Sequence, residues 1–136
     1  MAILRTERLS VTGESEIVAT RQLVRSLATS LGFTLVEQTK IVTAASELAR
    51  NTVQYGGGGT PVVDVLEDGG RRGIRLTFSD EGPGIPDIEK AMRDGYTTGG
   101  GLGLGLSGSR RLMNELTIES QVGRGTTVVA TRWRGA

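Results

Sequence analysis

The order of hydrophobic repeats along this chain restricts the folds that it can adopt. Two stretches with the 3.6-residue spacing of amphipathic helices follow each other directly, and stretches with the two-residue alternation of strands lie before and after them. One expected helix has Ser15 as its N-cap and ends before Gly32, and the next begins after "GFT" and ends at the glycines of 56–59. The expected strands are residues 2–11, 60–68, 73–80, 116–122 and 125–133, with a third helix at about 102–115 before the last two.

Two successive helices with hairpins on either side favour a mostly antiparallel sheet that helices cover on one face. We therefore predict an α+β fold, a two-layer α/β sandwich in which a mixed, mostly antiparallel sheet carries three main helices on one face. A chain of 136 residues can build one core and has no room for a second. We expect residues 1–136 to form a single domain.

The composition excludes several classes of function. Sixteen basic and fifteen acidic residues leave a net charge of +1, which gives no field that would favour nucleic acid or a membrane surface. The chain has no cysteine and no histidine, so disulfides, thiolate chemistry, phosphohistidine and a histidine base are all excluded. No apolar run has the length of a signal peptide or a membrane span, and we expect a cytoplasmic protein.

The second helical stretch contains a polar pair, Glu47 and Asn51, in "SELARNTVQY". Residues four apart are neighbours on one helix face, and this face points away from the apolar stripe. The pair is either a solvated surface pair or a functional one. In the functional interpretation Asn51 is an oxygen ligand for Mg²⁺, and Glu47 is a base for a water or hydroxyl beside the metal.

A turn-rich motif, "SDEGPGIPD", follows the strand that Asp80 ends. It is either a plain turn or part of a pocket. A buried carboxylate at a strand end can accept a hydrogen bond from an exocyclic amine such as that of adenine. Gly82 and Gly84 would then let the backbone come close to a flat base.

A run of six glycines, at positions 99, 100, 101, 103, 105 and 108, precedes the third helix. Without Cβ atoms, successive N–H groups can converge on an anion at the positive end of a helix dipole, so the run predicts a phosphate site. It differs from the phosphate loop that ends in Gly-Lys-Ser/Thr and from a strand-led dinucleotide fingerprint. The alternative is a flexible hinge.

Taken in order, these three motifs and "GRGTT" at 123–127 resemble those of the GHKL ATPase superfamily, which has the Bergerat ATP-binding fold. The stretches "SELARN", "DEGPGIPDIEKAMRDGYTTGGGLGLGL" and "RRLMNEL" resemble in particular the small bacterial serine kinases that act as anti-sigma factors or as switch kinases of the stressosome.

The resemblance implies ATP and Mg²⁺ as cofactors and assigns roles to individual residues. Glu47 would be the catalytic base, Asn51 the magnesium ligand and Asp80 the partner of the adenine amine. The other nucleotide-binding residues would be Gly82, Gly84 and Ile85 around the base, Thr126 through a water near adenine, and Gly99, Gly100, Gly101, Leu102, Gly103, Leu104 and Gly105 around the phosphates. Residues 85–99 would form a lid, with Pro86 and Asp87 opening a short helix.

The resemblance also implies a reaction and partners. Such a kinase would transfer the γ-phosphate of ATP to a serine of a STAS-domain scaffold or antagonist, leave it, and then activate a PP2C-type phosphatase. The sequence departs from the related anti-sigma factors because no Arg or Lys lies between Gly95 and Arg110. An alternative is therefore a nucleotide-gated binding module or anti-sigma factor with weak or no kinase activity. A further alternative, the catalytic domain of a sensor histidine kinase, is disfavoured because the chain has no histidine to phosphorylate.

Overall fold

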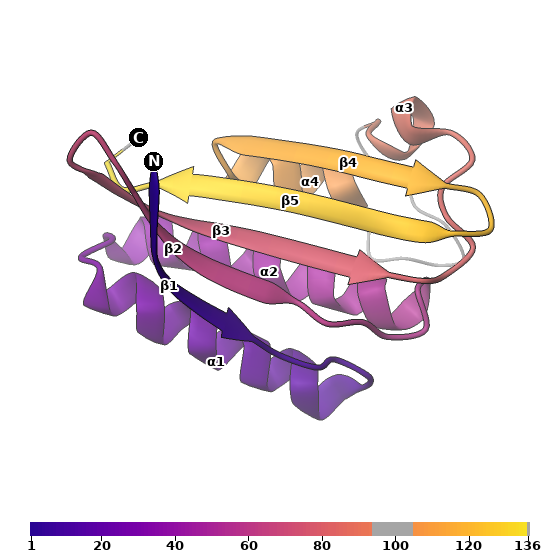
Figure 1. Ribbon diagram of the computed structural model, residues 1–136, viewed down its shortest axis with the longest axis horizontal. Helices are drawn as coiled ribbons and strands as arrows, with labels where there is room; N and C mark the ends of the chain where they lie inside the picture. Colours follow the sequence, from indigo (N-terminus) through magenta and orange to yellow (C-terminus); the bar gives the residue numbers. More distant parts are fainter. Residues whose placement is uncertain (94–104, 136) are drawn as a thin grey trace.

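The computed structural model describes residues 1–93 and 105–135, and these residues form five strands and four helices (Figure 1). In chain order they are β1 (Ala2–Arg8), α1 (Glu14–Ser30), α2 (Leu35–Gln54), β2 (Val62–Asp68), β3 (Arg71–Asp80), α3 (Ile88–Ala91), α4 (Gly105–Leu112), β4 (Glu115–Gln121) and β5 (Gly125–Trp133).

The strands form one sheet in the order β1-β2-β3-β5-β4, and every neighbouring pair is antiparallel. The expected mixed sheet is thus fully antiparallel in the described part of the chain. The β2–β3 hairpin turns at Gly69 and Gly70, whose φ angles are 58° and 86°. Positive φ at both central residues is the hairpin geometry that matches strand twist, which explains why two glycines stand there.

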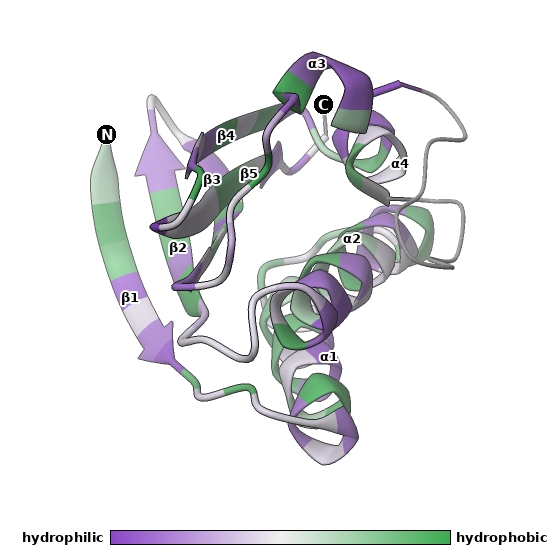
Figure 2. Ribbon diagram, turned by 90° about the vertical axis from the view of Figure 1, so that its right-hand side faces the viewer, coloured by the Kyte–Doolittle hydropathy of each residue, from purple (hydrophilic) through white to green (hydrophobic). Residues whose placement is uncertain are grey.

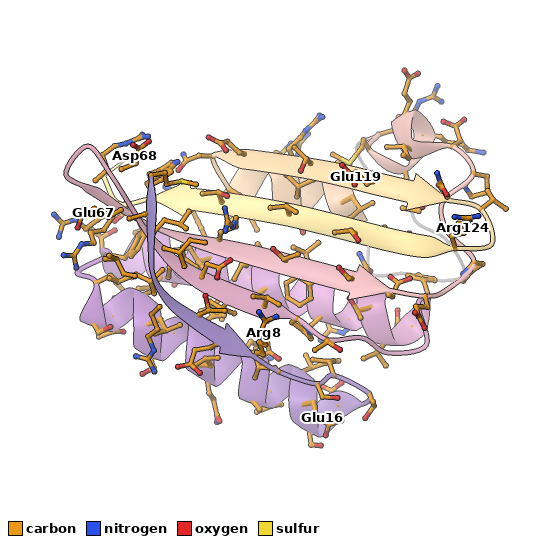
Figure 3. All side chains as sticks on the ribbon, viewed as in Figure 1. Arg8, Glu16, Glu67, Asp68, Glu119 and Arg124 are labelled. Carbon is orange, nitrogen blue, oxygen red and sulfur yellow. The ribbon has the colours of Figure 1, made fainter. Side chains whose placement is uncertain are left out.

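The molecule has two layers, with α1, α2 and α4 on one face of the sheet (Figure 2). The core fills the space between the layers, where Ile41 and Leu48 of α2 and Ile74 and Leu76 of β3 are fully buried. The predicted sandwich with three main helices on one face is confirmed. The other face of the sheet is open, and Figure 3 shows the charged side chains of Arg8 and Glu119 on it.

The start of α1 differs from the prediction. The helix begins at Glu14, with Gly13 at the N-cap position and no side-chain cap, so Ser15 is not the N-cap. The carboxylate of Glu16 accepts hydrogen bonds from the Ser15 hydroxyl and from the Thr12 hydroxyl and backbone N–H. These donors, Ser15 first, lower the pKa of Glu16 to about 2.

Helix α4 ends at Leu112, earlier than the expected end at about residue 115. Asn114 lies beside β5 instead: its N–H donates to the Thr131 carbonyl at 2.9 Å and its side-chain oxygen accepts from the Trp133 N–H at 2.7 Å. Asn114 therefore hydrogen-bonds to β5, at a position where helical spacing alone predicted a further turn of helix. No helix in residues 1–93 and 105–135 has both the length and the apolar character that crossing a membrane requires.

Candidate functional site

A cavity of about 690 Å³ lies between α2 and the end of the sheet at which β3 stops and β5 begins. Its walls come from the second half of α2, from β3 and β5, from the loop 83–87, from α3 and from Leu106 of α4. Its apolar lining includes Leu48, Phe78, Ile85, Ala91, Leu106 and Val128. Figure 1 shows this end of the molecule with α3 above the tips of β3 and β4.

Glu47 and Asn51 both line this cavity from α2. The Glu47 side chain is only 12% exposed, and Asn51 is half-buried. The apolar stripe of α2 packs on the sheet, and the adjoining helix face turns toward the cavity. The pair is thus not a freely solvated surface pair, which was one of the two interpretations of its spacing.

Asp80 ends β3, as predicted, and lines the cavity opposite α2. Its Oδ1 accepts the N–H of Gly82 at 2.9 Å, which fixes the carboxylate in the turn. Thr126, the first cavity-lining residue of β5, lies directly across the strand pair from Asp80. The structure therefore brings Glu47, Asn51, Asp80 and Thr126 to one cavity, although they come from three separate segments of the sequence.

The end of α2 approaches Asp80 closely because residue 56 is glycine. A Cβ at Gly56 would lie 2.4 Å from Cγ of Asp80, which is well inside contact distance. Sequence reasoning used the glycines of 56–59 only as the stop of a helix. Gly56 has a second role, which depends on its contact with Asp80, 24 positions later in the sequence. No local sequence pattern predicts this contact.

Gly82 and Gly84 are both required by close packing. A Cβ at Gly82 would lie 2.7 Å from the Tyr55 carbonyl oxygen, and one at Gly84 would lie 2.4 Å from the Gln121 carbonyl oxygen. Gly84 also has a φ of +79° and lines the cavity, whereas Gly82, predicted to lie around the base, is not among the residues that line it. These contacts join the loop to the end of α2 and to the β4–β5 hairpin.

Ser120 is a residue that sequence reasoning missed. Its hydroxyl accepts the backbone N–H of Ile85 at 2.7 Å and lies 2.9 Å from the Thr126 hydroxyl. It also donates to the carbonyl of Gly125 at 3.2 Å. Ser120 thus holds both Ile85 and Thr126, two predicted nucleotide-binding residues, in the cavity wall.

Helix α3 begins as predicted, because the Asp87 side chain accepts the N–H of Lys90 at 3.0 Å and caps it. Lys90 and Arg50 are the basic residues of the cavity wall in the described part of the chain. The predicted phosphate-binding residues Gly99, Gly100, Gly101, Leu102, Gly103 and Leu104 lie outside the described residues. Gly105 is the first residue of α4.

The fold and this site define a class of protein. Residues 36–134 match the family described as histidine kinase-, DNA gyrase B- and HSP90-like ATPases, and the chain belongs to that family. Within it, the chain is 49% identical over 120 residues to the serine/threonine-protein kinase RsbT of Bacillus subtilis (strain 168), a match that covers 88% of this chain and 90% of RsbT. It is 36% identical to the anti-sigma F factor of Geobacillus kaustophilus, over 89% of this chain and 86% of that protein.

Solved structures share the fold. The RsbU and RsbW domains of a Mycobacterium tuberculosis protein match with a TM-score of 0.62 and 23% identity, over 96% of this chain and 34% of that chain. The mycobacterial sensor histidine kinase MprB matches with a TM-score of 0.58 and 17% identity, over 96% of this chain and 98% of that chain.

These relatives confirm the family and the kinase homology that the motifs predicted. The chain is a GHKL-type ATP-binding protein and a close homologue of a partner-switching serine kinase, with anti-sigma factors as more distant homologues.

Proposed function

We propose that this chain is a cytoplasmic, magnesium-dependent serine kinase that phosphorylates a STAS-domain protein and then activates a PP2C-type phosphatase. The observation that carries the proposal is that Glu47, Asn51 and Asp80 line the same cavity. The names of two similar proteins, a serine/threonine kinase and an anti-sigma factor, support the choice of protein partners over small molecules.

The cavity fits a nucleotide in size and chemistry. Its volume of about 690 Å³ is typical of sites for cofactor-sized ligands. Its apolar lining suits the faces of a purine, and the carboxylate of Asp80 would accept a hydrogen bond from an exocyclic amine. Oδ1 of Asp80 already accepts from Gly82, so Oδ2 is the oxygen that we assign to the ligand.

The residues present also fit Mg²⁺ bound together with a nucleotide. The described residues contain no group of three or more acidic, His or Cys side chains that could hold a metal by themselves. Mg²⁺ characteristically binds through one or two protein oxygens, with phosphates and waters completing its octahedron. The side-chain oxygen of Asn51 would be such a ligand, and the ion would offset the charge of the phosphates.

We assign Glu47 the removal of the proton from the acceptor serine. Its carboxylate lies one helical turn from Asn51 on the same cavity wall, so a hydroxyl held near the metal would be within its reach. The acceptor hydroxyl would lose its proton to Glu47 while its oxygen bonds to the γ-phosphorus and ADP leaves.

Incubation with γ-labelled ATP and STAS-domain proteins encoded by neighbouring genes tests the proposal. We expect label on a serine of one of them. The Glu47→Gln variant should still bind ATP while transfer slows by roughly 10² to 10⁴, the usual effect of losing a general base. Transfer at the wild-type rate in this variant would remove Glu47 from the base role.

The second candidate is a nucleotide-gated binding module, which the lack of a basic residue between positions 95 and 110 favours. Without such a cation, the charge that develops on the γ-phosphate would be less well stabilised. Wild-type protein that labels no STAS domain, yet binds a PP2C-type phosphatase and activates it, would support this candidate over the kinase.

A further inference from the structure

Arg50 stands in a wall that two cavities share. It lines the candidate nucleotide cavity, and it also lines a second hollow of about 530 Å³ between α1 and α2. Glu47 is the other residue common to both cavities. Glu47, the candidate base, and Arg50 therefore lie at the boundary between the candidate nucleotide cavity and the second hollow.

Arg50 contacts Glu47 directly. Its Nη1 donates to Oε1 of Glu47 at 3.2 Å, and the two side chains are 21% and 12% exposed. In the described part of the chain, Oε2 of Glu47 has no hydrogen-bond partner. The contact thus engages one carboxylate oxygen and, as far as the described residues go, leaves the other without a donor.

This pair is more buried than the ion pairs on the rim of the sheet. In the pair Arg72–Glu67, for example, the side chains are 46% and 42% exposed. Among the described residues Arg75–Asp64, at 24% and 8% exposed, is buried to a similar degree. Exposed pairs are screened by water and hold neither partner firmly. A helical ion pair three residues apart contributes little to the stability of a helix, so helix stability alone gives little reason for an arginine in a cavity wall.

We propose that Arg50 is a positioning residue for phosphoryl transfer, which holds the carboxylate of Glu47 so that Oε2 faces the acceptor hydroxyl. This inference rests on the proposed function, because it takes Glu47 as the base. A misplaced catalytic group loses rate even when the substrate still binds, since the reacting atoms must meet within a fraction of an ångström. Arg50 acts through Glu47 and not on the nucleotide.

Single-turnover hydrolysis of γ-labelled ATP, with protein in excess, tests the inference without a protein partner. Arg50→Ala should slow phosphate release by roughly 10- to 100-fold while the dissociation constant for ATP changes less than about twofold. Arg50→Lys, which keeps the charge but not the planar fork, should recover part of the rate. Arg72→Ala removes an exposed ion pair far from the cavity and should match wild type.

The double variant Glu47→Gln, Arg50→Ala separates positioning from direct contact with phosphate. If Arg50 acts only through Glu47, the double variant hydrolyses ATP at the rate of Glu47→Gln alone. A further loss in the double variant, or an ATP affinity that falls with Arg50→Ala, would overturn the inference. Guanidinium chloride at low millimolar concentration should restore rate to Arg50→Ala and none to the double variant.

The result also distinguishes this inference from the proposed function. If wild type hydrolyses ATP and Glu47→Gln slows it, but Arg50→Ala matches wild type, the base assignment stands and the role of Arg50 falls. If wild type and Glu47→Gln hydrolyse ATP equally, the base assignment fails and the inference falls with it.

Discussion

Asp80 uses its two carboxylate oxygens differently. Oδ1 accepts the Gly82 N–H and shapes the turn, while Oδ2 lies beside Gly56 at the end of α2, where a Cβ would come within 2.7 Å of it. A glycine at position 56 therefore leaves the carboxylate in place without covering it. This arrangement suits an acceptor that must meet a ligand amine in a fixed direction.

Replacing Asp80 with Asn should weaken binding of both ATP and ADP by roughly 2 kcal/mol. The amide can keep its oxygen on the Gly82 N–H, which then leaves its NH₂ group facing the ligand amine, donor against donor. Calorimetric titration measures the loss. An unchanged affinity would remove Asp80 from the nucleotide site.

At the scale of residues, the sequence predicted those site members whose chemistry shows in local spacing. The i,i+4 pair Glu47 and Asn51 and the strand-ending Asp80 line the cavity. Gly56 and Ser120 were not predicted, because their importance comes from contacts with Asp80 and Ile85 in other elements. Arg50 was not predicted either, because its place in the walls of two cavities depends on how α2 packs against α1 and the sheet.

At the scale of elements, side-chain hydrogen bonds hold the N-terminus of α2. The Thr34 side chain accepts the Glu37 N–H at 3.2 Å, and Glu37 accepts the Thr34 N–H at 2.9 Å, which makes a capping box. Glu37 also accepts the N–H of Gly135 at 2.8 Å, so the same side chain fastens the end of the chain to α2. It is 8% exposed.

The Glu37→Gln change should therefore cost stability in a pH-dependent way. Burial works to raise the pKa of Glu37, but the N–H groups of Thr34 and Gly135, the Thr34 hydroxyl and the charge of Arg132 together outweigh it, so the pKa is lowered. A lowered pKa in the folded state adds stability above the unfolded-state pKa, and this contribution is lost as the pH falls through the folded-state pKa.

Urea unfolding of wild type and Glu37→Gln at several pH values measures this effect. We expect wild type to be more stable by about 1 to 2 kcal/mol near pH 7, with the gap closing as the pH falls through the lowered pKa of Glu37. Glu115→Gln changes an exposed glutamate of β4 and serves as the control. A gap that stays constant with pH would show that the charge of Glu37 does not contribute.

Element boundaries were less predictable than element types. The helical and alternating patterns identified α1, α2 and the five strands, because each buries one face. The ends followed tertiary hydrogen bonds instead: Glu16 reaches back to Thr12 at the start of α1, and Asn114 pairs with β5 after α4. The spacing of apolar residues cannot predict such hydrogen-bond partners, because these partners are polar.

For the whole molecule, the two-layer design separates the candidate site from the open face of the sheet. On that face Leu66 and Trp133 are 1% and 5% exposed, with Trp133 packed over Gly73 and under the guanidinium of Arg71 at 4.2 Å. Trp133 ends β5, while the cavity lies where β5 begins. The chain has one tryptophan, so its fluorescence reports unfolding without direct contact with a ligand in the cavity.

Nucleotide binding should stabilise the whole fold, because the cavity joins both layers and exists only when they are assembled. A ligand at 100 times its dissociation constant adds about 2.7 kcal/mol, which for a chain of this size raises the midpoint of thermal unfolding by on the order of 10 °C. Tryptophan fluorescence during heating measures the shift with ADP or ATP, in magnesium and in EDTA.

Wild type should gain more stability from the nucleotide in magnesium than in EDTA. The Asn51→Ala variant should lose that extra gain while keeping the shift seen in EDTA, because only the metal contact is removed. Equal losses in both buffers would make Asn51 a structural residue of α2, and no shift in wild type would exclude the cavity as a nucleotide site.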